Sequence, residues 1–274
     1  MKISKNNVIT HQPLSPDEIQ GAISTERLGK KIHWFETLPS TNIRAQELAR
    51  QGAAEGEIVL AEGQTQGKGR AGRSWVSPPY LNLYLSLILR PTLPPSCTPQ
   101  ITLMSAVALA DTIHSFLPSP PEIKWPNDIL VGGKKIAGIL TESCCEADGV
   151  VFVVVGIGVN LNFPRELMPK AIQNQATSFL ILTQKTVDRG TFTSRLIQDL
   201  DQCYGVLEGK GFPFIAKRWE SYFRLRGKKV RVDMPDGSVQ GKAMGIDTDG
   251  ALILEGEGGH RERIVAGDVI PIHS

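Results

Sequence analysis

Gly63–Trp75 reads GQTQGKGRAGRSW, a stretch that combines closely spaced glycines with three basic side chains. Residues 67–72 within it fit the G-x-G-x-x-G pattern, which is typical of phosphate-binding loops in dinucleotide-binding enzymes. Such a site needs a strand before the glycines and a helix that begins at the last one. EIVLAE predicts the strand, but RSWVSPPYLN contains two prolines that block the helix. We therefore predict a strand–loop–strand segment instead of a dinucleotide-binding site.

The basic side chains of this loop, Lys68, Arg70 and Arg73, favour an anion as its ligand. Glycine lets backbone N–H groups approach an anion closely, and Lys and Arg neutralise its charge. Protein kinases also use a strand–loop–strand glycine loop, but the sequence has neither an H-R-D nor a D-F-G motif. A solvated surface hairpin stays open as the other interpretation of this segment taken alone.

The composition indicates a globular protein that neither spans a membrane nor binds nucleic acid. Of the 274 residues, 41% are hydrophobic and 21% charged, and the formal net charge is only +2. Broad nucleic-acid binding would need a basic face. The N-terminal stretch lacks the apolar region of a signal peptide, and no apolar run reaches membrane-spanning length. The four cysteines have no metal-ligand spacing. We expect a soluble cytoplasmic protein with reduced thiols, either a monomer or a homodimer.

Hydrophobic periodicity predicts the remaining elements. After the loop, leucines alternate with polar residues and predict a half-buried strand. A hairpin that turns at Gly132-Gly133 and a fully buried strand follow. From Gly227 onward, glycine turns spaced roughly ten residues apart predict a small all-β barrel. The predicted ranges are 81–90 for the alternating strand, 150–160 for the buried strand, and 40–52, 98–117 and 192–223 for helices, the last with a break at 211–213.

Three further segments carry residue types that suit a binding site. The S-T-N segment at 40–42 has three small polar side chains at a helix start, where N-capping would explain one of them. Lys135, on the return strand of the hairpin, is either an exposed edge charge or a site residue. Gly156 and Gly158 end a buried strand, which indicates either the close approach of a ligand or a bulge.

Together these segments resemble the family of biotin protein ligases, also called biotin–acetyl-CoA-carboxylase ligases. The resemblance extends from about Leu28 to the C-terminus. It rests on five motifs in the family's order: S-T-N, Q-x-x-G-x-G-R-x-G-R-x-W, K-W-P-N-D followed by K-x-A-G-I-L, G-x-G-x-N, and G-A-L-x-L-E.

The resemblance implies an α+β fold whose central mixed or antiparallel sheet is flanked by helices, as in class II synthetases, with a small C-terminal SH3-like β-barrel. We accordingly expect a poorly ordered segment over 1–27, a catalytic domain over 28–225 and the barrel over 226–274, with the boundary near Arg224–Gly227.

The activity that the resemblance implies is ATP-dependent, AMP-forming ligation. Biotin is activated to biotinyl-5′-adenylate and transferred to a lysine of the biotin carboxyl carrier protein of acetyl-CoA carboxylase, with Mg²⁺ as the metal. A lipoate–protein ligase is the alternative of similar chemistry, although S-T-N and K-W-P-N-D favour biotin. A biotin-responsive DNA-binding regulator is the alternative from another class, but Met1–Lys30 shows scattered charge and prolines instead of a helix-turn-helix.

The same resemblance assigns roles to residues. The expected biotin-binding residues are Ser40, Thr41, Asn42, Gln64, Lys68, Gly69, Arg70 and Lys135, with S-T-N at the ureido end and Lys135 on the carboxylate side. The expected ATP- or adenylate-binding residues are Arg70, Arg73, Trp75, Lys124, Asn127 and Asn160, with Trp75 stacking on the adenine side. Lys68, Arg70 and Lys135 are the expected catalytic residues, and Asp128 is the candidate metal ligand. Lys68 stands where the family often has Arg, so we expect a point charge there instead of a bidentate contact.

Overall fold

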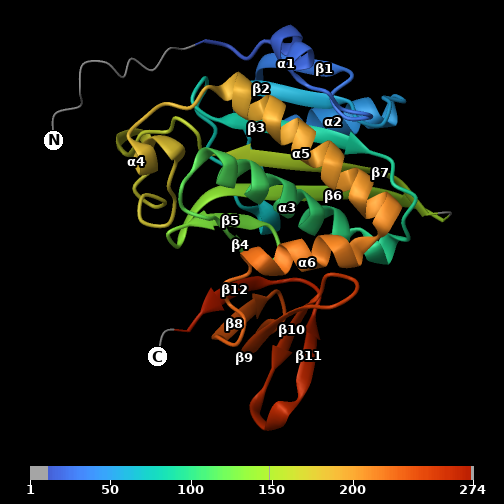
Figure 1. The fold of residues 1–274 in the computed structure, drawn as a ribbon, viewed down its shortest axis with the longest axis vertical. Helices are drawn as coiled ribbons and strands as arrows, with labels where there is room; N and C mark the ends of the chain where they lie inside the picture. Colours follow the sequence, from blue (N-terminus) through green and yellow to red (C-terminus); the bar gives the residue numbers. More distant parts are fainter. Residues whose placement is uncertain (1–11, 148, 273–274) are drawn as a thin grey trace.

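The computed structural model describes residues 12–147 and 149–272, which form two β-sheet domains (Figure 1). The strands of the larger domain are β1 (Ile32–Leu38), β2 (Ile58–Gln64), β3 (Leu83–Leu89), β4 (Glu122–Lys124), β5 (Asp128–Val131), β6 (Lys134–Glu146) and β7 (Gly149–Val159). They pair in the order β1-β2-β3-β7-β6-β5-β4, with only β1 and β2 parallel.

The smaller domain follows at the C-terminal end of the chain. Its strands are β8 (Lys229–Met234), β9 (Gly237–Ile246), β10 (Leu252–Glu255), β11 (Arg261–Ile264) and β12 (Asp268–Pro271). These five strands form an antiparallel sheet in the order β11-β10-β9-β8-β12. A mixed sheet with helices and a separate C-terminal β domain confirm the predicted fold class.

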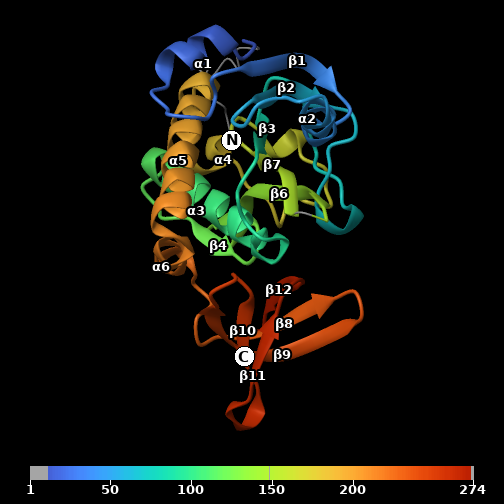
Figure 2. The same ribbon diagram turned by 90° about the vertical axis from the view of Figure 1, so that its right-hand side faces the viewer.

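Helices cover both faces of the large sheet (Figure 2). On one face lies α2 (Thr41–Arg50), and on the other lie α3 (Pro99–Phe116) and α5 (Arg189–Lys210). α5 ends at Gly211, and α6 (Phe212–Tyr222) leads to the smaller domain. The predicted helices at 40–52, 98–117 and 192–223, including the break in the last one, are therefore confirmed.

The strand that follows the glycine-rich loop is more deeply buried than its alternating pattern predicts. All seven residues of β3 are buried, including Tyr84 and Ser86 on the face that was expected to meet water. That face instead meets α2, because Ile88 packs in one apolar cluster with Ala45 of this helix. The prediction of a half-buried strand was wrong because α2 covers the face that was expected to meet water.

The segment before β1 also differs from its prediction. We expected residues 1–27 to be poorly ordered, and residues 1–11 lie outside the described residues. Residues 16–22 form α1 (Pro16–Ala22), which begins at the N-cap Ser15. Leu14 and Ile19 are buried in the main core. Over residues 12–27 the prediction was wrong because these two apolar side chains pack into the core of the larger domain.

A buried ion pair anchors this N-terminal segment to the sheet. Nη1 of Arg189 lies 2.7 Å from Oε2 of Glu62, and the two side chains are 6% and 0% exposed. The Leu14 backbone and the Trp34 ring donate hydrogen bonds to Oε1 of Glu62, and Arg189 donates to the Gln12 carbonyl. Burial of both charges is tolerated because each is paired and hydrogen-bonded.

The two domains meet through backbone contacts of the smaller one. Trp125 Nε1 donates to the Gly250 carbonyl at 3.0 Å, and Gln100 Nε2 donates to the Thr248 carbonyl at 3.1 Å. The side chain of Leu103 packs directly on Gly250. This docking places the start of β12 next to the glycine-rich loop. None of the helices formed by residues 12–147 and 149–272 is long and apolar enough to cross a membrane.

Replacement of Arg189 by Met is expected to lower the free energy of unfolding by about 3–5 kcal/mol, because the Glu62 carboxylate would stay buried without its partner. Urea denaturation measures this. Arg195 on the same helix is 50% exposed and pairs with Asp199. The matched substitution Arg195→Met should therefore cost less than about 1 kcal/mol. Equal losses in the two variants would contradict the role of the buried pair.

Candidate functional site

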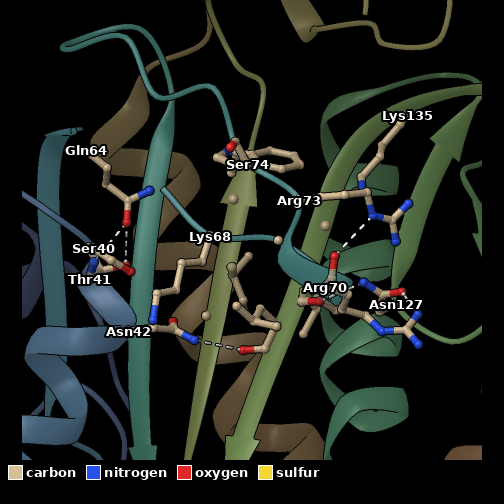
Figure 3. Close-up of a pocket in the computed structure, with 18 residues that line it drawn as sticks. Ser40, Thr41, Asn42, Gln64, Lys68, Arg70, Arg73, Ser74, Asn127 and Lys135 are labelled. Atoms are coloured by element: carbon tan, nitrogen blue, oxygen red, sulfur yellow. Dashed lines mark hydrogen bonds between the residues drawn. The ribbon is translucent and has the colours of Figure 1, made fainter. Parts of the chain in front are cut away.

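One pocket brings together most of the residues that the sequence singled out. It lies between the start of α2, the surface of β6 and β7, and the glycine-rich loop (Figure 3). Its volume is about 110 Å³. The predicted residues that line it are Ser40, Thr41, Asn42, Gln64, Lys68, Gly69, Arg70, Arg73, Trp75, Asn127 and Lys135. Lys124, Asp128 and Asn160 do not line it.

The S-T-N segment forms the polar end of the pocket, not a set of helix caps. Ser40 is the N-cap residue of α2, but its side chain makes no capping hydrogen bond. The Thr41 backbone N–H donates to Gln64 Oε1 at 2.8 Å, and the Thr41 hydroxyl lies 3.2 Å from the same oxygen. Gln64 is held in turn by Ser77, whose hydroxyl accepts from Nε2 at 2.9 Å.

Two side chains pack directly on the glycines near the end of β7, Asn42 on Gly156 and Trp75 on Gly158. A Cβ atom on Gly156 would lie 2.0 Å from Asn42 Oδ1, and one on Gly158 would lie 2.5 Å from the Trp75 ring. The register between β6 and β7 shifts only at Cys144/Cys145, so these glycines mark no bulge. They give Asn42 and Trp75 room to lie flat on the sheet and form the walls of the pocket.

The glycine-rich loop is a tight turn between two strands, which confirms the strand–loop–strand prediction. The Gly69 N–H donates to the Arg73 carbonyl at 2.6 Å, and the Trp75 N–H donates to the Gly67 carbonyl at 2.8 Å. Ala71 has a left-handed backbone, with φ of 52°. This turn aims Arg70 and Arg73 toward the smaller domain, while Lys68 extends toward Asn42 (Figure 3).

Residues of the smaller domain hold the two arginines of the loop. The Arg73 guanidinium bonds to both oxygens of Asp268, at 3.0 and 3.1 Å. Arg70 Nη1 donates to Asn127 Oδ1 at 2.8 Å and lies 3.9 Å from Asp268. Burial lowers the pKa of the Arg70 guanidinium from its ordinary value, and the charges of Asp268 and Asp128 partly oppose this.

Lys135 is a site residue, not an edge charge. Its Nζ lies 2.7 Å from Asp128 Oδ1 and 5.3 Å from the centre of the Trp75 ring. Apart from this ion pair, Asp128 Oδ1 is buried without a hydrogen bond. Among residues 12–147 and 149–272, no cluster of three or more His, Cys, Asp or Glu side chains could hold a metal. A metal here would need ligands from a bound substrate in addition to Asp128.

Two predicted nucleotide-binding residues lie outside the pocket. Lys124 ends β4, where it pairs in the sheet with Asp128. Asn160 is buried, and its Nδ2 donates to the Thr177 carbonyl at 3.0 Å, which ties the segment before α4 (Phe179–Thr183) to the end of β7. A nucleotide role for either residue stays a prediction.

Besides Ser74, Ile139, Leu140 and Ile157, which line the pocket, three further side chains that bond to its residues were not predicted from the sequence. Ser86 and Glu142 bond to the S-T-N segment from β3 and β6, and Asp268 bonds to the loop from β12. Ser86 lies between two leucines in the sequence, and a polar residue between apolar ones was the only local sign of its role. Nothing local marks Glu142 or Asp268, because their partners lie 100 and 195 residues away in the chain.

A second cavity adjoins the pocket at the junction of the two domains. It has a volume of about 540 Å³ and shares Arg70, Asn127 and Ile139 with the first pocket. Trp125 lies on the side of the larger domain and Val265 on the side of the smaller domain. Arg70 of the loop therefore borders both a small polar pocket and a larger, more apolar cavity.

Comparison with known proteins identifies relatives over most of the chain. Residues 34–160 match the Biotin/lipoate A/B protein ligase family, and residues 226–270 match the Biotin protein ligase C terminal domain. The bifunctional ligase/repressor BirA of Bacillus subtilis is 39% identical over 242 residues, which cover 88% of this chain and 74% of that protein. The biotin–[acetyl-CoA-carboxylase] ligase of Mycobacterium tuberculosis is 33% identical, over 84% of this chain and 85% of that protein.

Solved structures agree with these relatives. The biotin protein ligase from Aquifex aeolicus in complex with biotin and ATP superposes with a TM-score of 0.76 at 27% identity. The match covers 89% of this chain and 100% of that chain. Both the large sheet domain and the C-terminal domain thus have counterparts in an enzyme whose structure holds the two small molecules.

The substitution Asp268→Asn is expected to release the glycine-rich loop, because Arg73 loses its two-bond ion pair with the Asp268 carboxylate. Trypsin cleavage after Lys68, Arg70 and Arg73 should then be several times faster than in the unaltered protein, as followed by mass spectrometry. Asp233→Asn is the matched control, since Asp233 pairs with Asp268 in the sheet but bonds to Arg231. Equal cleavage rates in the two variants would contradict the restraint by Asp268.

Proposed function

The chain belongs to the biotin protein ligase family, and we propose that it activates biotin with ATP and transfers the biotinyl group to a carrier protein. The acceptor is a lysine of the biotin carboxyl carrier protein of acetyl-CoA carboxylase. One observation carries the proposal: a single pocket has the S-T-N segment at one end and Arg70, Arg73 and Lys135 at the other, with Lys68 reaching toward Asn42 between them (Figure 3). Such a pocket suits a molecule with a neutral polar head and a carboxylate.

The first step joins two anions. An oxygen of the biotin carboxylate attacks the α-phosphorus of ATP, the bond to the pyrophosphate oxygen breaks, and biotinyl-5′-adenylate and pyrophosphate result. Two unit negative charges at contact repel by several kcal/mol at the effective dielectric constant of a protein site, about 4 kcal/mol at 4 Å. Lys68, Arg70, Arg73 and Lys135 offset this repulsion from three sides of the pocket. Catalysis then consists mainly of positioning and charge stabilisation.

The cations of the site differ in how their charge is compensated. Arg73 and Lys135 pair with Asp268 and Asp128, and Arg70 lies at the edge of the first pair. Lys68 makes no ion pair with any described residue. We infer that Lys68 attracts the incoming carboxylate, and that phosphate oxygens compete with the two aspartates for the remaining cations.

Mg²⁺ fits this arrangement only together with substrate. Magnesium usually takes one or two carboxylates plus phosphate oxygens and water. Asp128 Oδ1 is a buried acceptor whose partner among the described residues is Lys135 Nζ at 2.7 Å, so Asp128 would hold the ion once phosphates draw Lys135 away and supply the other ligands. When bound, the ion neutralises charge on the phosphates.

The second step transfers the biotinyl group. The amine of the acceptor lysine attacks the carbonyl carbon of the mixed anhydride, the bond to the phosphate oxygen breaks, and AMP leaves. No side-chain nucleophile takes part, since the adenylate is already an activated acyl group. Water competes with the amine, so a loop that covers the anhydride prevents its loss. The glycine-rich loop, which lies over the pocket and carries Arg70, is our candidate for this lid.

The alternatives predict different ligands. The matched family includes lipoate ligases, and lipoate also presents a carboxylate but lacks the ureido group. The Bacillus relative is named a bifunctional ligase/repressor, which makes a DNA-binding regulator the alternative from another class. The described part of the segment before β1 contains a single seven-residue helix, α1. We place the enzyme in the cytoplasm, where its free thiols would stay reduced.

Biotin-dependent exchange of radioactive pyrophosphate into ATP tests the first step. We expect exchange with biotin and much slower exchange with lipoate at the same concentration. Exchange with lipoate alone would identify a lipoate ligase. Exchange with neither acid would refute the proposed function.

Replacement of Arg70 by Gly is expected to retain part of the pyrophosphate exchange but to release the adenylate. Adenylate found in the filtrate after ultrafiltration, relative to adenylate retained with the protein, measures this leakage. The control is Arg261→Gly. Arg261 is exposed on β11, which lies at the opposite edge of the smaller sheet from β12, the strand that contacts the loop. If the Arg70 variant kept adenylate as tightly as the control does, the loop would not be a lid.

A further inference from the structure

We propose that Ser86 and Glu142 are positioning residues that make the Thr41 hydroxyl oxygen an acceptor for a ureido N–H of the substrate. The inference rests on the proposed function, because it names how the polar end of the pocket would read biotin. Both residues act through others: Glu142 contacts Asn42, and Ser86 contacts Asn42 and Thr41. Neither residue lines the pocket itself.

Glu142 determines which way the Asn42 amide points. Asn42 Nδ2 donates to Glu142 Oε2 at 2.7 Å and to the Leu140 carbonyl at 3.2 Å. Both partners are acceptors only, so the NH₂ group must face them and the amide oxygen must face the opposite way. The amide also lies against Gly156, where a Cβ atom would be 2.0 Å from Oδ1. The acceptors and the close packing together allow one orientation.

This orientation determines the direction of the Ser86 hydrogen bonds. Ser86 Oγ lies 2.6 Å from Asn42 Oδ1 and 2.8 Å from Thr41 Oγ1. The amide oxygen cannot donate, so the single hydroxyl hydrogen of Ser86 must point toward it. Ser86 is fully buried, so its hydroxyl does not face bulk solvent. Its oxygen is thus left to accept from the Thr41 hydroxyl.

Thr41 consequently presents an oxygen, not a hydrogen, to the pocket. Its hydroxyl hydrogen goes to Ser86 Oγ at 2.8 Å or to Gln64 Oε1 at 3.2 Å, and both are protein groups. The remaining lone pair of Oγ1 suits an N–H donor. The neighbouring Ser40 hydroxyl makes no hydrogen bond among the described residues, so it can donate to a carbonyl. A donor next to an acceptor matches the C=O and N–H of a ureido group.

The same polarity explains selection against other carboxylic acids. A site built to bond an N–H group rejects a ligand without one, because its own buried polar groups are left unpaired. The dithiolane ring of lipoate has no N–H group. Ser86 and Glu142 would therefore act in specificity without touching the substrate.

Pyrophosphate exchange in five variants tests the inference. Glu142→Ala frees the Asn42 amide to turn, and we expect the KM for biotin to rise roughly tenfold while the KM for ATP stays unchanged. Glu142→Gln keeps an acceptor oxygen for Nδ2 and should restore a KM near that of the unaltered enzyme. Ser86→Ala removes the hydrogen bonds from Ser86 to Asn42 and Thr41, and it should raise the KM for biotin similarly. In an Asn42→Ala background, Glu142→Ala should have no further effect.

A biotin analogue methylated on its ureido nitrogens provides a second readout. The unaltered enzyme should prefer biotin strongly, and the preference should fall in Glu142→Ala and Ser86→Ala. An unchanged KM for biotin and an unchanged preference in both variants would overturn the inference. So would equal effects of Glu142→Ala with and without Asn42. Should Glu142→Ala fail to fold, as judged by thermal unfolding, Ser86→Ala decides alone. If the unaltered enzyme shows no biotin-dependent exchange, the proposed function fails. If it shows exchange but the variants behave like it, only this inference fails.

Discussion

Compensation of positive charge is the constraint on which the site depends. Four cationic side chains line one small pocket, and without partners they would repel one another. Asp268 of the smaller domain and Asp128 of the hairpin each hold one of them at salt-bridge distance. The site is thus complete only when the two domains are docked, because one of the two compensating carboxylates comes from β12. Under the proposed function, phosphate oxygens would take over the same contacts, so an arrangement that is stable without substrate would also be prepared to bind it.

Room at the surface of the sheet is the second requirement. The pocket lies directly on β6 and β7, and side chains at Gly156 and Gly158 would fill the space that Asn42 and Trp75 occupy. With both glycines present, the Asn42 amide and the Trp75 indole ring form two walls of the pocket, and the space between them suits a flat, partly polar ligand. The bonds of Asn42 with Glu142 and Ser86 then turn a polar wall into one with a defined direction of hydrogen bonding.

Much of this site could be predicted from the sequence because its motifs are local. The prolines after the glycine loop excluded a helix, and the loop is indeed a turn between two strands. Most residues that the resemblance suggested line one pocket, whereas Lys124 and Asn160 do not. The prediction that β3 is half buried was wrong, because it depended on a contact that is not local. Alternation predicts which side chains share a face, but it cannot tell whether water or a helix covers that face.

The sequence by itself determined the family, the order of the elements and the residue types that meet at the pocket, since each depends on short segments with their own chemistry. Only the tertiary structure decided that α2 covers the polar face of β3, that Glu142 orients Asn42, and that Asp268 holds the loop. Those contacts join segments far apart in the chain. Their existence depends on how sheets, helices and domains pack, because no local pattern of residues specifies a partner 100 or 195 positions away.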